Sequence, residues 1–215
     1  MSRQTNGRVR HPIFARSWGR AVALSDRRGA EEHRRELLAG LSGRVVEVGS
    51  GDGANFAHYP TTVERVVAIE PERYLRRQAE QAALSAPVPV TVLDGVAEHL
   101  PGEDRAFDAG VVSLVLCSVP DQDQALAELF RAIRPGGGLR FYEHVVSDSP
   151  NTARLQRLAD ATIWPLAVGG CHLARDTTAA IRRAGFVLED FERFPFSPGP
   201  LLTLPYVLGT ARRPG

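Results

Sequence analysis

The feature that most constrains this chain is a β-branched run that ends directly in three closely spaced glycines: Val45-Val46-Glu47-Val48-Gly49-Ser50-Gly51-Asp52-Gly53. The apolar run predicts a buried strand. Glycines at alternate positions let the backbone turn steeply and let a ligand approach the bare main chain. The helix that should follow begins with free N–H donors, which favour polar or anionic ligand groups. Strand, glycine turn and helix in this order predict the first unit of a parallel α/β sheet.

The rest of the chain alternates between strand-like and helical patterns. Further strand-like runs cover residues 65–69, 88–93, 107–116, 139–146, 186–194 and 202–211. Helical patterns cover residues 11–41, 72–84 and 152–164, and two more helices are expected after the N-cap candidates Asp121 and Asp176. The regular alternation and the lack of a convincing linker predict a single doubly wound α/β domain.

The basic residues are all of one kind, since each of the 26 Lys or Arg positions is arginine. Without a lysine amine, the chain cannot be a Schiff-base aldolase, a pyridoxal-phosphate enzyme, a P-loop NTPase or a protein kinase. The formal net charge is only +1. A nucleic-acid-binding domain normally carries a clear basic excess, so we expect no nucleic-acid partner.

The number of cysteines and the length of the apolar runs indicate where in the cell the protein is expected. The two cysteines, Cys117 and Cys171, are too few for a disulfide framework or a four-ligand metal site by themselves. His, Asp and Glu show no tight ligand spacing, so no metal is expected. The apolar stretch between Ile13 and Leu24 is interrupted by arginines, and residues 110–119 are too few to span a bilayer. We therefore expect a cytoplasmic protein with no integral membrane association.

Two acidic residues follow the next predicted strands. Glu70 ends the second strand, where a carboxylate can accept hydrogen bonds from both ribose hydroxyls of a nucleoside. Asp94 closes the third, where an adenine amino group can be recognised. The carboxyl ends of parallel strands share one edge of the sheet, so glycine loop and acids should meet there. A dinucleotide-binding dehydrogenase remains an alternative, because Ala54 stands where such fingerprints allow Gly or Ala.

Together these features resemble a class I methyltransferase that uses S-adenosylmethionine (SAM). The glycine string, both acids, the loop at 116–118 and the Arg-Pro-Gly-Gly turn at 134–137 match in order. Residues 55–60, 114–119, 142–145, Trp164 and 170–177 further resemble the alkyl-thiol methyltransferase family and its bacterial relatives, over about residues 44–212. The resemblance implies a seven-stranded Rossmann-like sheet, mostly parallel with the last strand antiparallel. Residues 1–41 would form a helical cover on a SAM-binding domain at 42–215, in one structural domain.

The resemblance and the strand ends also assign the site. SAM, which becomes S-adenosylhomocysteine, is expected to contact a set of loop and strand-end residues. They are Glu47, Gly49, Ser50, Gly51, Gly53, Asn55, Glu70, Pro71, Asp94, Gly95, Leu116 and Cys117. The acceptor pocket is expected to be lined by Phe14, Trp18, Tyr59, Ser118 and Trp164. This largely aromatic set suits a small hydrophobic acceptor.

The SAM sulfonium is already an activated electrophile, so the chain must mainly hold an acceptor in line and help remove a proton. The candidate proton acceptors are His144 and His172. Glu143 should point the opposite way from His144 in a strand. The family resemblance implies S-methylation of a thiol. O- or C-methylation of a phenolic or quinone-like metabolite is the alternative, and a non-catalytic SAM-binding regulatory module is an alternative of another class.

Overall fold

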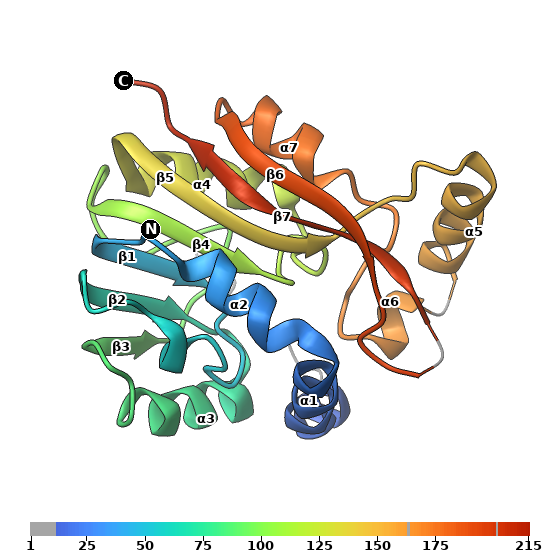
Figure 1. Ribbon diagram of the computed structural model, residues 1–215, viewed down its shortest axis with the longest axis horizontal. Helices are drawn as coiled ribbons and strands as arrows, with labels where there is room; N and C mark the ends of the chain where they lie inside the picture. The colour runs from blue at the N-terminus through green and yellow to red at the C-terminus, as the bar shows by residue number, and fades with distance from the viewer. Residues whose placement is uncertain (1–11, 163, 201) are drawn as a thin grey trace, which may run out of the picture.

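The computed structural model describes residues 12–162, 164–200 and 202–215, without the side chains of residues 12–14. Its centre is a seven-stranded sheet in the order β3-β2-β1-β4-β5-β7-β6 (Figure 1). The strands are β1 Gly43–Val48, β2 Val63–Ile69, β3 Val90–Leu93, β4 Phe107–Ser113, β5 Ile133–His144, β6 Val187–Phe196 and β7 Leu204–Arg212. β1 to β5 pair in parallel, and β7 runs antiparallel between β5 and β6. The predicted sheet is confirmed.

Helices fill the connections between the strands. They are α1 Pro12–Ser25, α2 Glu31–Leu38, α3 Arg73–Ala83, α4 Gln122–Ala132, α5 Pro150–Asp160, α6 Trp164–Ala167 and α7 Thr177–Arg183. The two predicted N-caps are confirmed. The Asp121 carboxylate accepts from the Gln124 N–H at 2.9 Å, and the Asp176 carboxylate accepts from the Ala179 N–H at 3.0 Å. Each carboxylate satisfies a backbone donor that the first helical turn leaves unpaired.

Both faces of the sheet are buried, which explains why its central strands read as continuous apolar runs. On one face, side chains of α2 and α3 pack with Val45, Val66 and Tyr142. On the other, side chains of α4 and α7 pack with Val46, Val112 and Phe141. Consecutive residues of one strand therefore enter different cores, as the two-residue repeat of a strand requires.

Two helical predictions are corrected. The expected helix over 11–41 is two helices joined by a π-helical segment, Asp26–Ala30, in which Gly29 has φ +111°. Residue 11 itself lies outside the described part. The expected helix over 152–164 ends at Asp160, and a separate short helix begins at Trp164. Among the described residues, no helix has both the length and the apolar character needed to cross a bilayer.

The carboxyl ends of the five parallel strands meet at one edge of the sheet (Figure 1). Beyond this edge lie α1, α6 and the distal part of the β6–β7 hairpin. α2 instead packs on the sheet, where Leu37 and Leu38 are buried. Of the N-terminal elements, α1 is therefore the one that covers the edge at which α/β proteins bind their ligands.

Candidate active site

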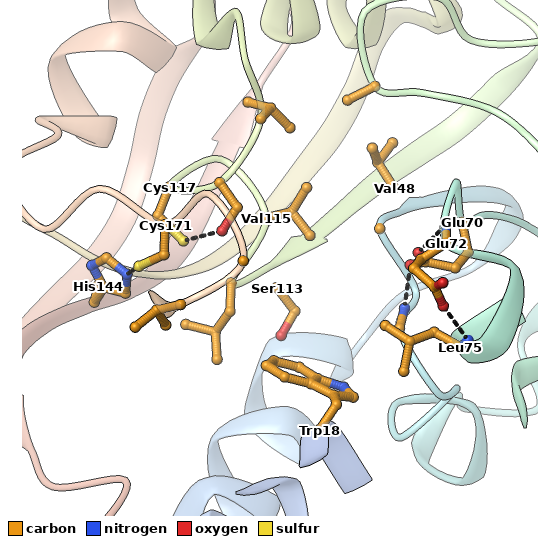
Figure 2. Close-up of a pocket in the computed structure, with 18 of the residues that line it drawn as sticks. Trp18, Val48, Glu70, Glu72, Leu75, Ser113, Val115, Cys117, His144 and Cys171 are labelled. Carbon is orange, nitrogen blue, oxygen red and sulfur yellow. Dashed lines mark hydrogen bonds between the residues drawn. The ribbon is translucent and has the colours of Figure 1, made fainter. Parts of the chain in front are cut away.

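A cavity of about 420 Å³ opens at this edge of the sheet. Figure 2 shows Glu70 and Glu72 at one end, Cys117, His144 and Cys171 at the other, with Trp18 of α1 between them. Many of the expected site residues line it. These are Trp18, Gly49, Gly51, Glu70, Pro71, Gly95, Cys117, Ser118, His144 and Trp164. The side chain of Phe14 lies outside the described part of the chain.

The glycine loop leaves room at the floor of the cavity because two of its positions exclude a side chain. Gly49 has φ +67°, and a Cβ there would lie 2.9 Å from Cγ1 of Val115 and closer still to Cγ2. Gly51 has φ +58°, and a Cβ there would lie 3.0 Å from the indole nitrogen of Trp18. Only glycine adopts this backbone without strain, and only glycine leaves the main chain open to a ligand.

Glu70 ties the end of β2 to the glycine loop. One carboxylate oxygen accepts from the Gly51 N–H at 2.9 Å, and the other accepts from the Glu72 N–H at 2.8 Å. Burial raises the pKa of Glu70 to about 7, although the two N–H donors act in the opposite direction. Each oxygen keeps a further lone pair, so the carboxylate can also accept from ligand hydroxyls.

Glu47 lies behind the loop rather than in the main cavity. Its carboxylate accepts from Asn55 Nδ2 at 2.8 Å and from the Tyr59 hydroxyl at 2.7 Å. Burial raises the pKa of Glu47 to about 7. Glu47, Ser50 and Asn55 line a small adjoining cavity. Tyr59, expected in the acceptor pocket, is instead buried against Glu47 and is not among the described residues that line either cavity.

Three other expected contacts also lie off the main cavity in the described structure. The Asp94 side chain is 73% exposed and pairs with Arg76 at 3.0 Å, so the backbone at Gly95 lines the cavity instead. Gly53 packs beneath the loop, where a Cβ would lie 2.8 Å from the Phe56 ring. Leu116 is fully buried in the core. The position of a residue near a strand end is therefore not sufficient to predict the direction of its side chain.

The loop after β4 is held by a buried acid that the sequence did not single out for the site. The Glu143 carboxylate accepts from the backbone N–H groups of Val115, Leu116 and Cys117, at 2.8, 3.0 and 3.3 Å. Burial raises the pKa of Glu143. As expected from strand alternation, Glu143 and His144 face different surroundings. An acid beside apolar residues in a central strand was the available signal, because a buried carboxylate needs donors.

Cysteine and histidine side chains gather at the acceptor end of the cavity. His144 Nε2 lies 2.9 Å from Cys171 Sγ. The ligand atoms of Cys117, His144 and Cys171 all lie within 4.8 Å of one another. A hydrogen bond with Cys117 and burial raise the pKa of Cys171 far above its ordinary range. No metal was expected from the sequence, because two cysteines are too few for a four-ligand site and because His, Asp and Glu show no tight ligand spacing.

His172 differs from His144 in its placement. Its backbone N–H donates to the Cys117 carbonyl at 2.8 Å, which joins the two loops. Its side chain is not among the described groups that line the cavity. Its Nδ1 is buried and has no hydrogen-bond partner within the described part of the chain. The structure thus brings one of the two candidate histidines to the cavity.

The glycine cradle, the acid directly after β2 and a Rossmann-like sheet with an antiparallel seventh strand define a class I SAM-dependent methyltransferase. The residues present fit SAM, because a Cβ would fill the cradle at Gly49 and Gly51 and because Glu70 offers buried acceptor oxygens. The family model described as "Methyltransferase domain" matches residues 46–141. SAM is therefore the methyl donor, and the dehydrogenase alternative does not hold.

Similarity to curated proteins shows which family of methyltransferases the chain belongs to. The thiol S-methyltransferase TMT1B of Mus musculus is 35% identical over 197 residues, which cover 84% of this chain and 78% of the relative. TMT1A of Homo sapiens is 32% identical over 180 residues, covering 81% and 73%. The chain belongs to this thiol S-methyltransferase family. The C-methyltransferase UbiE of Syntrophotalea carbinolica is 29% identical over 175 residues, covering 76% and 73%.

Solved structures support the fold. The SAM-dependent methyltransferase of Thermotoga maritima superposes with a TM-score of 0.68 at 21% identity, covering 94% of this chain and 98% of that one. The S-adenosylmethionine-dependent methyltransferase of Mesorhizobium loti gives 0.63 at 21% identity, covering 86% and 99%. At such identities the likeness concerns the fold alone.

Proposed function

We propose that this methyltransferase transfers the methyl group of SAM to the sulfur of a small hydrophobic thiol. The observation that carries the proposal is the similarity to TMT1A and TMT1B over more than two thirds of their length. The cavity supports it, because its acceptor end is formed by apolar and aromatic side chains around Cys117, His144 and Cys171. Such a surface favours a small apolar acceptor over a charged one.

For the cofactor, we propose that the backbone at Gly49 and Gly51 receives the methionine part of SAM. The Glu70 carboxylate would accept from both ribose hydroxyls, since its position at the end of β2 is where such acids act. Gly95 would border the adenine. Asp94 would help to position this part of the site through its ion pair with Arg76. Glu47 and Asn55 would support the loop from behind.

For the acceptor, we propose contacts with Trp18, Ser118 and Trp164, and with the imidazole of His144. Bound SAM supplies a methyl group already activated on a sulfonium. The chain's own task is then to hold the acceptor in line and to exclude water. A thiol ionises near pH 8.5, so only a modest lowering of its pKa is needed. We propose no catalytic role for His172, because its side chain is not among the described groups that line this cavity.

Matched acceptors test the proposal. The enzyme would be incubated with SAM and either thiophenol or phenol, and with either hexanethiol or hexanol, while S-adenosylhomocysteine is measured. We expect product with each thiol and at most trace product with its oxygen analogue. Methylation of phenol with none of either thiol would overturn the proposal.

A second candidate is C- or O-methylation of a phenolic or quinone-like metabolite. It is favoured by the similarity to UbiE, whose name states C-methylation in ubiquinone and menaquinone biosynthesis. A demethylated quinol added to the same acceptor panel, with products identified by mass spectrometry, separates the two. A C-methylated quinol as the main product would replace the thiol proposal.

A further inference from the structure

The acceptor end of the cavity holds a set of side chains that methyl transfer alone does not require. Cys117 lies in the loop after β4, His144 ends β5, and Cys171 lies in the loop between α6 and α7. All three line the cavity, yet they are only 2%, 6% and 7% exposed. Figure 2 shows the three side chains close together. Their ligand atoms all lie within 4.8 Å of one another.

Two thiolates and one imidazole are a donor set that zinc prefers. With Zn–S bonds of about 2.3 Å and Zn–N bonds of about 2.0 Å, neighbouring ligand atoms of a tetrahedral site lie about 3.5 to 3.8 Å apart. The described spacing brackets this range, since His144 Nε2 and Cys171 Sγ are 2.9 Å apart and the widest pair is within 4.8 Å. Shifts of about 1 Å or less would bring these ligand atoms to tetrahedral spacing. Before an acceptor binds, two thiolates neutralise the charge of the dication in this buried site.

The backbone around the three side chains is already fixed. Glu143 accepts from the Cys117 N–H at 3.3 Å, and the Cys117 carbonyl accepts from the His172 N–H at 2.8 Å. The first bond joins the Cys117 loop to β5, and the second joins it to the Cys171 loop. The Ser118 hydroxyl lies 3.4 Å from Cys117 Sγ and can donate to a thiolate there. Outer partners of this kind orient metal ligands.

We propose that Cys117, His144 and Cys171 bind one zinc ion whose fourth coordination position faces the cavity and takes the sulfur of the acceptor. Three protein ligands with one open position is the pattern of catalytic zinc sites, whereas structural zinc sites are closed. That the acceptor occupies the fourth position rests on the proposed thiol S-methylation. Zinc binding itself does not.

The resulting step balances. The acceptor thiol loses its proton to solvent on binding zinc and remains as a thiolate, because a coordinated thiol is deprotonated. Its sulfur electron pair forms the new bond to the methyl carbon. The bond from that carbon to the sulfonium sulfur breaks, and its electrons stay on that sulfur as a neutral thioether. The methylated acceptor, now also a neutral thioether, is a weaker zinc ligand and leaves.

Metal binding tests the site without any acceptor or SAM. The full chain, purified under reducing conditions and titrated with Zn²⁺ against a chromophoric chelator, is expected to hold one zinc ion per chain. Co²⁺ in its place is expected to show thiolate-to-cobalt charge transfer and the visible bands of a tetrahedral ion. Cys171→Ser and His144→Ala should each weaken zinc binding at least tenfold. The exposed His99→Ala is the matched control and should retain it.

Folding of each variant is checked on the metal-free protein by a single cooperative unfolding transition, and by SAM affinity, which should stay near wild type. Zinc content unchanged in Cys171→Ser and His144→Ala would overturn the site. Absence of a chelator-competing site in the reduced wild type would also overturn it, as would a Cys117–Cys171 disulfide in the protein purified with reductant. If zinc binds as expected but no thiol is methylated, the proposed function fails and the site stands. If thiols are methylated equally fast with and without zinc, the role of the fourth position fails.

Discussion

Replacing Glu70 by glutamine tests the assigned ribose contact most directly. The carboxylate of Glu70 sits between two backbone donors, Gly51 N–H and Glu72 N–H, and one face remains open to the cavity. Glutamine has nearly the same shape but turns one acceptor oxygen into an NH₂ group. It therefore removes the charge and one acceptor while leaving the cavity about the same size.

The expected loss follows from the hydrogen bonds involved. Bonds to a charged group contribute about 1.5 to 3 kcal/mol each, and glutamine keeps one neutral acceptor. A net loss of about 2 to 3 kcal/mol corresponds to a SAM dissociation constant about 30- to 150-fold higher. The change of SAM affinity with pH is a second quantity that can be predicted. Because the pKa of Glu70 is about 7 and the ionised form accepts from the ribose, affinity should rise with pH. Between pH 6 and pH 8 the ionised fraction grows about tenfold.

Isothermal titration with SAM at pH 6, 7 and 8 measures both effects. Glu64→Gln, an exposed change on the same strand, is the matched control and should behave as wild type. We expect Glu70→Gln to bind weakly at pH 8 and to lose most of the wild-type pH dependence. A dissociation constant within threefold of wild type at pH 8 would refute the ribose contact. A wild-type pH slope in the variant would refute the assignment of the titration to Glu70.

Three further predictions concern the framework of the site. Gly49→Ala should lower the free energy of unfolding by about 2 to 5 kcal/mol, since its Cβ would overlap Val115 and its φ is +67°; an unchanged melting temperature would contradict this. Glu143→Ala leaves three N–H groups unpaired, two of them buried and one partly buried, and should lower the free energy of unfolding in urea by about 3 kcal/mol or more; a loss of less than 1 kcal/mol would show that the loop does not depend on Glu143. Glu47 has a folded pKa of about 7, above its ordinary 4.5, so its contribution to stability is complete below pH 4.5 and is lost as pH rises to 7. The loss is about 3 kcal/mol. Glu47→Gln should reduce the slope of stability against pH measured from pH 4.5 to 8, while the part due to Glu70 remains; a slope identical to wild type would contradict the reasoning.

Local chemistry made several elements predictable. The strand that ends at Val48, the turn at Gly49 and the caps Asp121 and Asp176 depend on neighbouring residues, so short patterns reveal them. The fourth strand was expected to continue to Leu116 but ends at Ser113. At the next residue the chain turns with φ +58°, and the following N–H groups bond to a side chain 26 to 28 positions further along. No local pattern could predict that turn.

The direction of the side chains at the strand ends could not be predicted from the sequence either. Glu70 and Asp94 occupy corresponding places in the sequence pattern, yet Glu70 bonds to the glycine loop and Asp94 faces solvent beside Arg76. The difference comes from neighbours contributed by other elements. Gly51 supplies an N–H donor to one acid, and α3 supplies a guanidinium to the other.

The fold class and the family could be predicted from residue order, and a SAM cradle from glycine's backbone freedom and an acid after a strand. Which side chains form the far end of the cavity depends on contacts between distant parts of the chain. The sheet order β1-β4-β5 sets the ends of β4 and β5 side by side, and the bond from His172 N–H to the Cys117 carbonyl adds the loop before α7. Cys117, His144 and Cys171 meet through these long-range contacts. Residues so far apart along the chain leave no periodic signal, since their proximity exists only once the sheet has formed.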